Sequence, residues 1–243
     1  YNLEEVHPGL FLPIAYIVTY DREGYLAHIK QRAMSQTVGS FGLELTDVRK
    51  RLFEIVDLLE SKALEKKFSP PRRKQRSLEA LLEDTAVKKS IFTYVHRLVA
   101  ELLSQVVQHR FPITWNVERK VLVKDFVLDI GESELEARLA FQRTESEVLY
   151  QLQLANGSGP WKIKDKEVIP ITNHPAWLYV DHTLYHVPDI NGNMVKPFRQ
   201  RDEVRIPEDK VKTYFQKFIL KIASRVDIEA KGFDVVQYDE LQA

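Results

Sequence analysis

Two stretches in the first half of the chain carry apolar residues at the three-to-four-residue spacing of an amphipathic helix. In residues 47–67 the apolar face consists of Val48, Leu52, Ile55, Val56, Leu59 and Ala63. In residues 77–108 it consists of Val87, Ile91, Val95, Leu98, Leu102 and Val106. The two stretches lie next to each other in the chain, so the pattern predicts an αα-hairpin.

Residues suited to helix ends stand at the limits of both stretches. Thr46 and Ser77 can each accept hydrogen bonds from the first free N–H groups of a helix. Ser69-Pro70-Pro71 ends the first helix, because proline cannot continue the hydrogen-bond ladder. Asp84 and Thr85 predict a break inside the second helix.

Alternating apolar and polar positions, typical of strands, precede and follow the helices. Residues 9–20 and 25–31 predict two strands around a turn at 21–24. The later strands are expected at 113–117, 120–128, 135–142, 147–154, 168–171, 177–180 and 183–187. Asp181-His182 predicts a two-residue hairpin turn with positive φ, and Asn191-Gly192 is a second turn signal.

A last helix is expected to begin at Pro207 and to bury one apolar face in the core. That face consists of Val211, Tyr214, Phe215, Phe218, Ile219 and Ile222. A strand at about 226–236 follows. The fold class is therefore α+β, an antiparallel sheet with a central αα-hairpin and a C-terminal amphipathic helix. We divide the chain into 1–110 and 111–243, two parts that could also form one compact unit.

The composition excludes several kinds of partner and site. Lys plus Arg and Asp plus Glu number 35 each, so the whole chain offers no strong field to nucleic acid or a membrane. The chain has no cysteine, which excludes disulfides and thiolate chemistry and suits a cytoplasmic location. No apolar run approaches the roughly 18 residues of a membrane span. We expect no membrane partner.

Catalytic motifs are absent from the sequence. It contains no phosphate-binding loop, no Gly-x-Ser-x-Gly and no His-Glu-x-x-His. We therefore expect no catalytic residue and no cofactor. His174, His182 and His186 are the nearest to a metal cluster, but we interpret them as turn and sheet residues. Asp129 before Glu136-Ala137-Arg138 resembles a nuclease pattern only in part, because arginine replaces the lysine such a site needs.

A basic stretch at residues 62–76 stands out in this neutral chain. It carries seven basic side chains against Glu65 alone. Such a cluster attracts phosphates, although basic residues also suit the C-terminal end of a helix. The candidate nucleic-acid contacts are Lys66, Lys67, Arg72, Arg73, Lys74 and Arg76. Trp115, Trp161 and Trp177 could stack bases, but core packing is the more common role of tryptophan.

Several segments of the C-terminal third resemble a known family. They are Pro175–Asp181, Thr183–Tyr185, Asp189–Phe198, Ile206-Pro207, Tyr214-Phe215-x-x-Phe218 and Ala230–Phe233. Together they resemble the region before the motor in a group of bacterial Swi/Snf-type helicase-like ATPases. The resemblance implies that the ATP-binding and DNA-translocating motifs lie further along a larger protein. It therefore assigns no catalytic residue here.

These observations favour an accessory, non-catalytic N-terminal region of a DNA-dependent ATPase. Its expected partners are the motor domains of the same polypeptide and double-stranded DNA. Two alternatives remain at this point. The chain could be a structural or protein-binding module without a role in nucleic-acid binding, or a small metal-dependent nuclease that uses Asp129 and Glu136.

Overall fold

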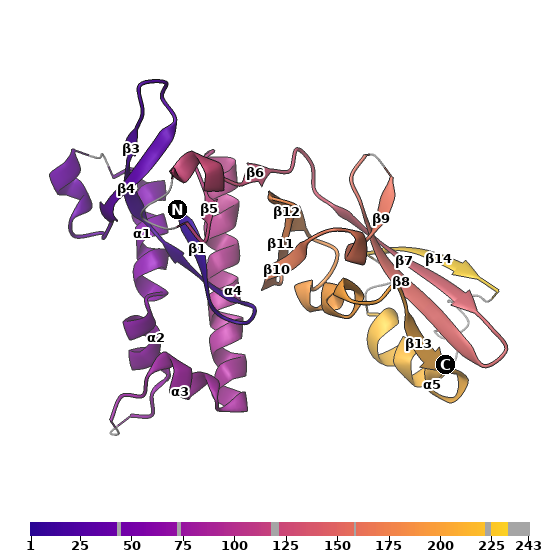
Figure 1. Ribbon diagram of the computed structural model, residues 1–243. Coiled ribbons are helices and arrows are strands. Elements are labelled where there is room, and N and C mark those ends of the chain that lie inside the picture. Colours follow the sequence, from indigo (N-terminus) through magenta and orange to yellow (C-terminus); the bar gives the residue numbers. More distant parts are fainter. Residues whose placement is uncertain (43–44, 72–73, 118–121, 158, 222–224, 233–243) are drawn as a thin grey trace. The chain divides into compact units, whose positions relative to one another are not determined.

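Helices and antiparallel strands occur together throughout the chain, so the predicted α+β class is confirmed. The computed structural model describes residues 1–42, 45–71, 74–117, 122–157, 159–221 and 225–232. The chain forms two compact units, Tyr1–Asp129 and Ile130–Ala243, both shown in Figure 1.

Two hairpins begin the first unit. β1 (Asn2–His7) and β2 (Leu10–Ile14) pair antiparallel, and the short β5 (Thr114–Trp115) pairs parallel to β1. β3 (Tyr16–Tyr20) and β4 (Leu26–Arg32) form a separate two-stranded sheet. The single strand predicted over 9–20 is therefore two strands, because the chain passes from one sheet to the other at the buried Ala15.

Four α-helices follow, and local capping sets where three of them begin. They are α1 (Asp47–Leu58), α2 (Ser61–Phe68), α3 (Leu78–Leu82) and α4 (Thr85–Gln108), after a 3₁₀ turn at Val38–Phe41. Thr46 accepts a hydrogen bond from the amide of Arg49, and Ser77 accepts one from Ala80. Asp84 accepts two, from the amides of Ala86 and Val87. The caps at Thr46 and Ser77 and the break at Asp84 agree with the prediction, whereas the cap made by the Asp84 side chain was not predicted.

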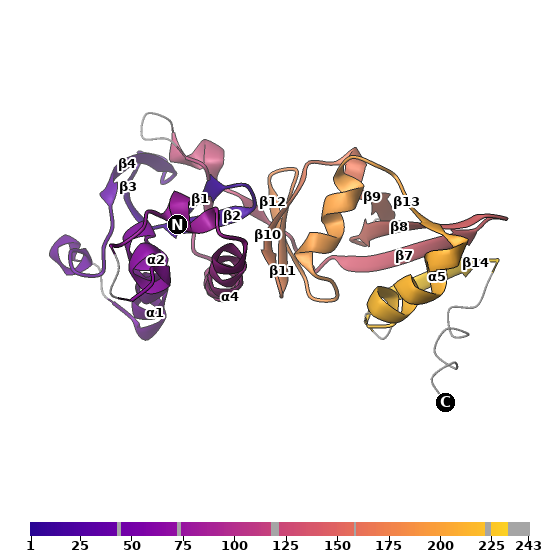
Figure 2. The same ribbon diagram turned by 90° about the horizontal axis from the view of Figure 1, so that it is seen from below.

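The predicted apolar faces form the core of the first unit. α4 contacts α1, α2, α3 and β2, and Figures 1 and 2 show it running alongside α1 and α2. Its buried residues are Ile91, Val95, His96, Leu98, Val99, Ala100, Leu102, Leu103 and Val106. The helix predicted over 47–67 differs in one respect. It divides into α1 and α2 at Leu59 and Glu60, where the buried Leu59 lies between two shorter helices.

The first unit extends beyond the predicted boundary at residue 110. The hydroxyl of Thr114 donates to the side-chain oxygen of Asn2 over 2.9 Å, and the amide of Val117 donates to the same oxygen over 3.1 Å. These bonds join β5 to the start of the chain. The strand predicted at 120–128 is wrong in its described part, which forms a 3₁₀ turn at Val123–Phe126. The 3₁₀ turn buries Val123, as a strand would have done. The alternation of apolar positions therefore could not distinguish the turn from a strand.

A twisted sheet forms one half of the second unit. β7 (Glu136–Arg143) and β8 (Glu147–Ala155) make its central hairpin and alternate between buried and more exposed residues. β13 (Val204–Pro207) and β9 (Pro160–Lys162) pair antiparallel to β8, and β14 (Asp227–Lys231) pairs parallel to β7. The buried side chains of β7 and β8 belong to the same core as Phe198, Val211, Phe215 and Ile219.

The second sheet of this unit contains the predicted two-residue hairpin. Its order is β10 (Val168–Asn173), β11 (Ala176–Val180), β12 (Thr183–Val187) and β6 (Asp129–Ile130). Asp181 and His182 connect β11 to β12 with φ of 45° and 72°, as predicted. Asn191, by contrast, begins a 3₁₀ helix at Gly192–Arg199, and its side chain accepts a hydrogen bond from the amide of Asn193.

The last helix begins after Pro207 and changes its winding. Pro207 is the final residue of β13, and α5 (Glu208–Tyr214) continues into a π-helical turn at Phe215–Ile219. Val211, Phe215 and Ile219 are buried, but Phe218 is 57% exposed, so its predicted place in the core is wrong. The wider π turn keeps Phe215 and Ile219 on the buried side and directs Phe218 outward. Ile222 lies outside the described residues.

Candidate nucleic-acid interface

The predicted phosphate contacts lie around the end of α2 and the link to α3. Lys66 and Lys67 occupy the last turn of α2 and are exposed. Lys74 is exposed in the link. Arg72 and Arg73 lie outside the described residues. The positions of Lys66, Lys67 and Lys74 leave their charges accessible to a partner.

Arg76 differs from these lysines because its side chain stabilises the link itself. Its guanidinium donates to the carbonyl oxygen of Ala80, and its amide donates to the hydroxyl of Ser69 over 2.9 Å. Glu65 strengthens the same link, since one carboxylate oxygen accepts from the amide of Leu78 over 3.0 Å. Arg76 is half-buried. Its first role is therefore structural.

Two cations of α4 join Lys67 on one surface. Lys67 lies with its ammonium nitrogen 4.6 Å from the centroid of the Tyr94 ring, and the Arg97 guanidinium carbon lies 5.9 Å from the same centroid. The ring of Phe68 meets Tyr94 edge to face at 5.7 Å. A shallow depression of about 450 Å³ is lined by Lys67, Phe68, Lys89, Ser90, Thr93, Tyr94 and Arg97. We call these residues the basic surface.

The charge of the basic surface is positive and uncompensated at close range. Lys67, Lys89 and Arg97 are all exposed, and none of the described residues that line the depression is acidic. Within the described ranges, no carboxylate lies within 4.0 Å of these three cations. A polyanion can therefore approach them without displacing an ion pair.

Sequence reasoning identified Lys67 but missed Lys89 and Arg97. A signal was present, because Lys89, Thr93 and Arg97 recur every four residues on the side of α4 opposite its apolar face. What the sequence did not show is that the end of α2 packs beside this part of α4.

The histidines are placed in structural roles. The Nδ1 atom of His186 lies 2.5 Å from the carboxylate of Glu134, and its ring packs on Trp177 with centroids 4.9 Å apart. His182 occupies the hairpin turn, and His174 precedes a cis proline. Within the described ranges no three His, Asp or Glu side chains are grouped so that they could hold a metal ion.

The nuclease pattern is not assembled into a site. Arg138, at the position where the nuclease would need lysine, donates from Nε to the carboxylate of Asp227 over 2.8 Å. This pair crosses β7 and β14, where the two residues are in register. Arg138 therefore stabilises a strand pair, and neither Asp129 nor Glu136 belongs to a metal-binding group in the described ranges.

The three tryptophans are covered to different extents. Trp177 is buried, with 4% of its surface exposed. Trp115 packs on Phe11 with ring centroids 5.0 Å apart. Trp161 is half-buried, and the ammonium nitrogen of Lys166 lies 5.2 Å from the centroid of its ring. None of the three presents a fully open ring, which favours their interpretation as packing residues.

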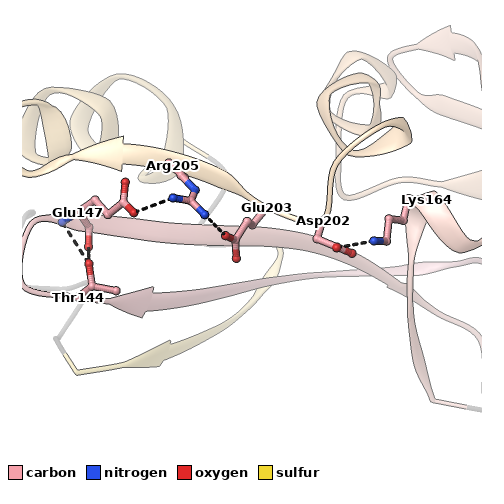
Figure 3. A network of polar contacts seen from close by, with 6 residues as sticks. All are labelled: Thr144, Glu147, Lys164, Asp202, Glu203 and Arg205. Carbon is pink, nitrogen blue, oxygen red and sulfur yellow. Dashed lines mark hydrogen bonds and ion pairs between the residues drawn. The ribbon is translucent and has the colours of Figure 1, made fainter.

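A surface network of ion pairs joins the strands of the second unit (Figure 3). Arg205 on β13 lies between Glu147 and Glu203, at 3.4 Å and 3.3 Å. Lys164 pairs with Asp202, and this hydrogen bond raises the pKa of Lys164 and lowers that of Asp202. All these groups are at least partly exposed to solvent, and ion pairs in contact with solvent contribute little stability. The backbone ladder pairs β13 with β8, and the Arg205–Glu147 pair adds one side-chain link between them. The groups of this network offer no unpaired nucleophile or base.

Comparisons with known proteins identify no relative. The sequence matches no protein-family model, no curated protein and no solved structure. Among the helices in the described ranges, none combines the length and apolar character of a membrane-spanning helix.

Proposed function

We propose that this chain is the accessory, non-catalytic N-terminal region of a DNA-dependent Swi/Snf-type ATPase, and that its basic surface contacts DNA phosphates. The observation that carries the DNA contact is the convergence of Lys67, Lys89 and Arg97 from two helices on a surface with no acidic lining residue. The assignment to this class of ATPase rests on the sequence resemblance in the C-terminal third.

The geometry of the basic surface favours phosphates over bases. Lys67, Arg97 and Phe68 surround the ring of Tyr94, so this ring positions cations and is not open for stacking. Lys89 and Arg97 are eight residues apart on α4, which separates them by about 12 Å along the helix axis. That distance is close to the width of about 12 Å of a DNA major groove. We therefore propose contacts to the two strands that border one groove, without base recognition.

Docking to the motor domains of the same polypeptide is the second part of the proposal. Phe218 is 57% exposed and packs against Tyr214 with ring centroids 5.0 Å apart. Tyr214 is half-buried against the core, so Phe218 is the exposed ring of the pair. Aromatic side chains are enriched in surfaces that bind proteins. The same observation favours the alternative function, a protein-binding module that makes no contact with nucleic acid.

Fluorescence anisotropy of a labelled duplex, titrated with salt, tests the DNA contact. The variant K67A/K89A/R97A removes all three cations of the basic surface. Its matched control is K210A/K212A/K217A, which removes three exposed lysines from the last helix. We expect the first variant to bind duplex at least tenfold more weakly at low salt and its salt slope to fall by about 3, one unit per lost phosphate contact.

The control should keep both its affinity and its slope. If both variants lost the same affinity, DNA binding would depend on the positive charges of the chain as a whole and not on the basic surface. Failure of the unmodified chain to bind duplex at low salt would contradict the DNA contact and would favour the protein-binding alternative.

A further inference from the structure

The β3–β4 hairpin is an outlying element of the first unit. Its two strands pair only with each other among the described residues. Figure 1 shows the hairpin at the N-terminal end of α1, whereas α2 follows from the other end of that helix. The basic surface includes Lys67 and Phe68 at the far end of α2. A ligand that binds the tip of the hairpin would therefore contact residues separate from the basic surface.

Local hydrogen bonds hold the tip of the hairpin in one conformation. The Asp21 carboxylate accepts from the amides of Glu23 and Tyr25, over 3.0 Å and 2.8 Å. The amide of Asp21 donates to the carbonyl of Tyr25 over 2.9 Å. Gly24 has a φ of +86°, which glycine adopts without strain. The residues on either side of the turn are thus presented at fixed positions.

Two tyrosine rings are exposed at this tip. Tyr20 is 66% exposed and Tyr25 is 54% exposed. Packing accounts for only part of the Tyr20 side chain. That part lines an apolar cavity, together with Leu26 and Ile29. Exposed aromatic rings on a rigid turn cost little entropy when a ligand stacks on them.

A cation accompanies one of these rings. The ammonium nitrogen of Lys124 lies 5.0 Å from the centroid of the Tyr25 ring. More than half of Tyr25 is still exposed, so the ring can contact a ligand while the lysine remains beside it. An aromatic ring with a cation at its side is the arrangement found where proteins stack nucleic-acid bases near a phosphate.

The tip has little net charge, unlike the basic surface. Arg22 and Glu23 are both exposed there, and the carboxylate of Asp21 is engaged by two amides. Attraction of phosphates is therefore weak at the tip. Stacking is the interaction its side chains supply best, and an unpaired base is the ligand with an accessible π-face.

We propose that Tyr20 and Tyr25 stack on unpaired bases of DNA, so that the hairpin binds single-stranded segments. The proposal rests on the proposed function and deepens it. The basic surface binds the phosphates of the duplex, and the hairpin binds bases where the strands are separated.

Anisotropy with three labelled probes tests this inference. The probes are an oligo-dT single strand, a blunt duplex and the same duplex with an oligo-dT tail. Y20A/Y25A should bind the single strand at least about 25-fold more weakly, because each of the two lost stacking contacts weakens binding about fivefold or more. Its affinity for the blunt duplex and its salt slope should not change.

Three further variants control for misfolding and for general effects of removing an aromatic ring. Y20L/Y25L keeps apolar bulk over the cavity but removes both rings, and should lose the same affinity as Y20A/Y25A with an unchanged melting temperature. Phe41→Ala removes an exposed ring elsewhere and should bind all three probes normally. Y20F/Y25F should retain binding, because phenylalanine stacks as tyrosine does.

The outcomes separate the two proposals. If Y20L/Y25L binds the single strand as well as the unmodified chain does, the hairpin proposal is overturned whatever the basic surface does. If single-strand binding requires the tyrosines but duplex binding does not depend on K67A/K89A/R97A, the hairpin proposal stands and the duplex proposal fails. If no probe binds at low salt, both are overturned.

Discussion

The ammonium nitrogen of Lys67 at the end of α2 lies 4.6 Å from the centre of the Tyr94 ring on α4. The contact joins two helices that are separated in the chain by the α2–α3 link and by α3. It holds a flexible, strongly hydrated cation in a defined place beside Arg97. The ring of Tyr94 thus organises the cations of the basic surface.

Replacing Tyr94 should weaken duplex binding without removing a charge. A cation–π contact at an exposed site contributes about 0.5–1 kcal/mol, so Tyr94→Leu should lower affinity roughly two- to fivefold. The salt slope should stay unchanged, because the number of cations is unchanged. Tyr94→Phe keeps the ring and is the control. Anisotropy titrations that show identical affinity for Tyr94→Leu and the unmodified chain would contradict this role.

Asp84 should be important for the stability of the first unit. Its carboxylate accepts from the amides of Ala86 and Val87, over 3.0 Å and 3.1 Å, at the start of the long helix α4. Loss of such a cap costs about 1 kcal/mol, so Asp84→Ala should lower the melting temperature by about 2–4 °C. Asp84→Asn retains a capping oxygen and should melt within about 1 °C of the unmodified chain. Thermal unfolding followed by circular dichroism measures both.

Glu65 should protect the α2–α3 link from proteolysis. Its two carboxylate oxygens accept from the amide of Leu78 over 3.0 Å and from the side chain of Gln75 over 3.2 Å. In Glu65→Ala the link loses both bonds, and trypsin should cleave after Lys74 several-fold faster. Glu79→Ala, a change of an exposed residue in α3, is the control. Equal cleavage rates in the two variants would show that the link does not depend on Glu65.

The second unit should lose stability in alkali through Tyr150. Burial, together with a 2.5 Å hydrogen bond between the hydroxyls of Tyr150 and Tyr214, raises the pKa of Tyr150 well above its usual value. Above pH 10 or so the unfolded state therefore releases a proton that the folded state keeps, and the free energy of unfolding falls as pH rises. Below that pH the Tyr150 hydroxyl is protonated in both the folded and the unfolded state, so its full contribution to the free energy of unfolding is present.

Urea titrations at pH 8 and pH 11 measure this effect. The free energy of unfolding should fall less between the two values in Tyr150→Phe than in the unmodified chain, since phenylalanine does not ionise. Tyr20→Phe, at an exposed position, should leave the fall unchanged. The same fall in Tyr150→Phe as in the unmodified chain would rule out a contribution from Tyr150.

Gly192 should not tolerate a side chain. A Cβ atom at this position would lie 2.3 Å from the backbone carbonyl oxygen of Thr172. Gly192→Ala should therefore destabilise the second unit by about 1–3 kcal/mol, the usual cost of overpacking. At Gly39, by contrast, a Cβ would have no atom within 4 Å, so Gly39→Ala is the control. Equal urea midpoints for the two variants would contradict this close approach.

Features that depend on neighbouring residues were predictable from the sequence. The caps at Thr46, Ser77 and Asp84 form with amides two or three residues away. The hairpin turn at Asp181-His182 depends on the tolerance of these two residues for positive φ. Helical and strand periodicity also showed which faces of α4 and β8 are buried.

Features that depend on distant contacts were not predictable in this way. Phe218 fits the apolar face of a regular helix. In the structure it lies in a π turn that buries Phe215 and Ile219, and Phe218 is left exposed. Val123 alternates like a strand residue, yet it is buried by a 3₁₀ turn. In both cases several local conformations bury the same apolar residues, and tertiary packing selects among them.

The candidate interface shows the same division between sequence and structure. The sequence by itself determined that basic side chains cluster at the end of α2, because the charges are adjacent in the chain. Only the tertiary structure decided that Lys67 lies with Lys89 and Arg97, and that Arg76 stabilises a link instead. The physical reason is that helix packing sets which exposed faces adjoin, and this packing depends on side-chain contacts between residues far apart in the chain.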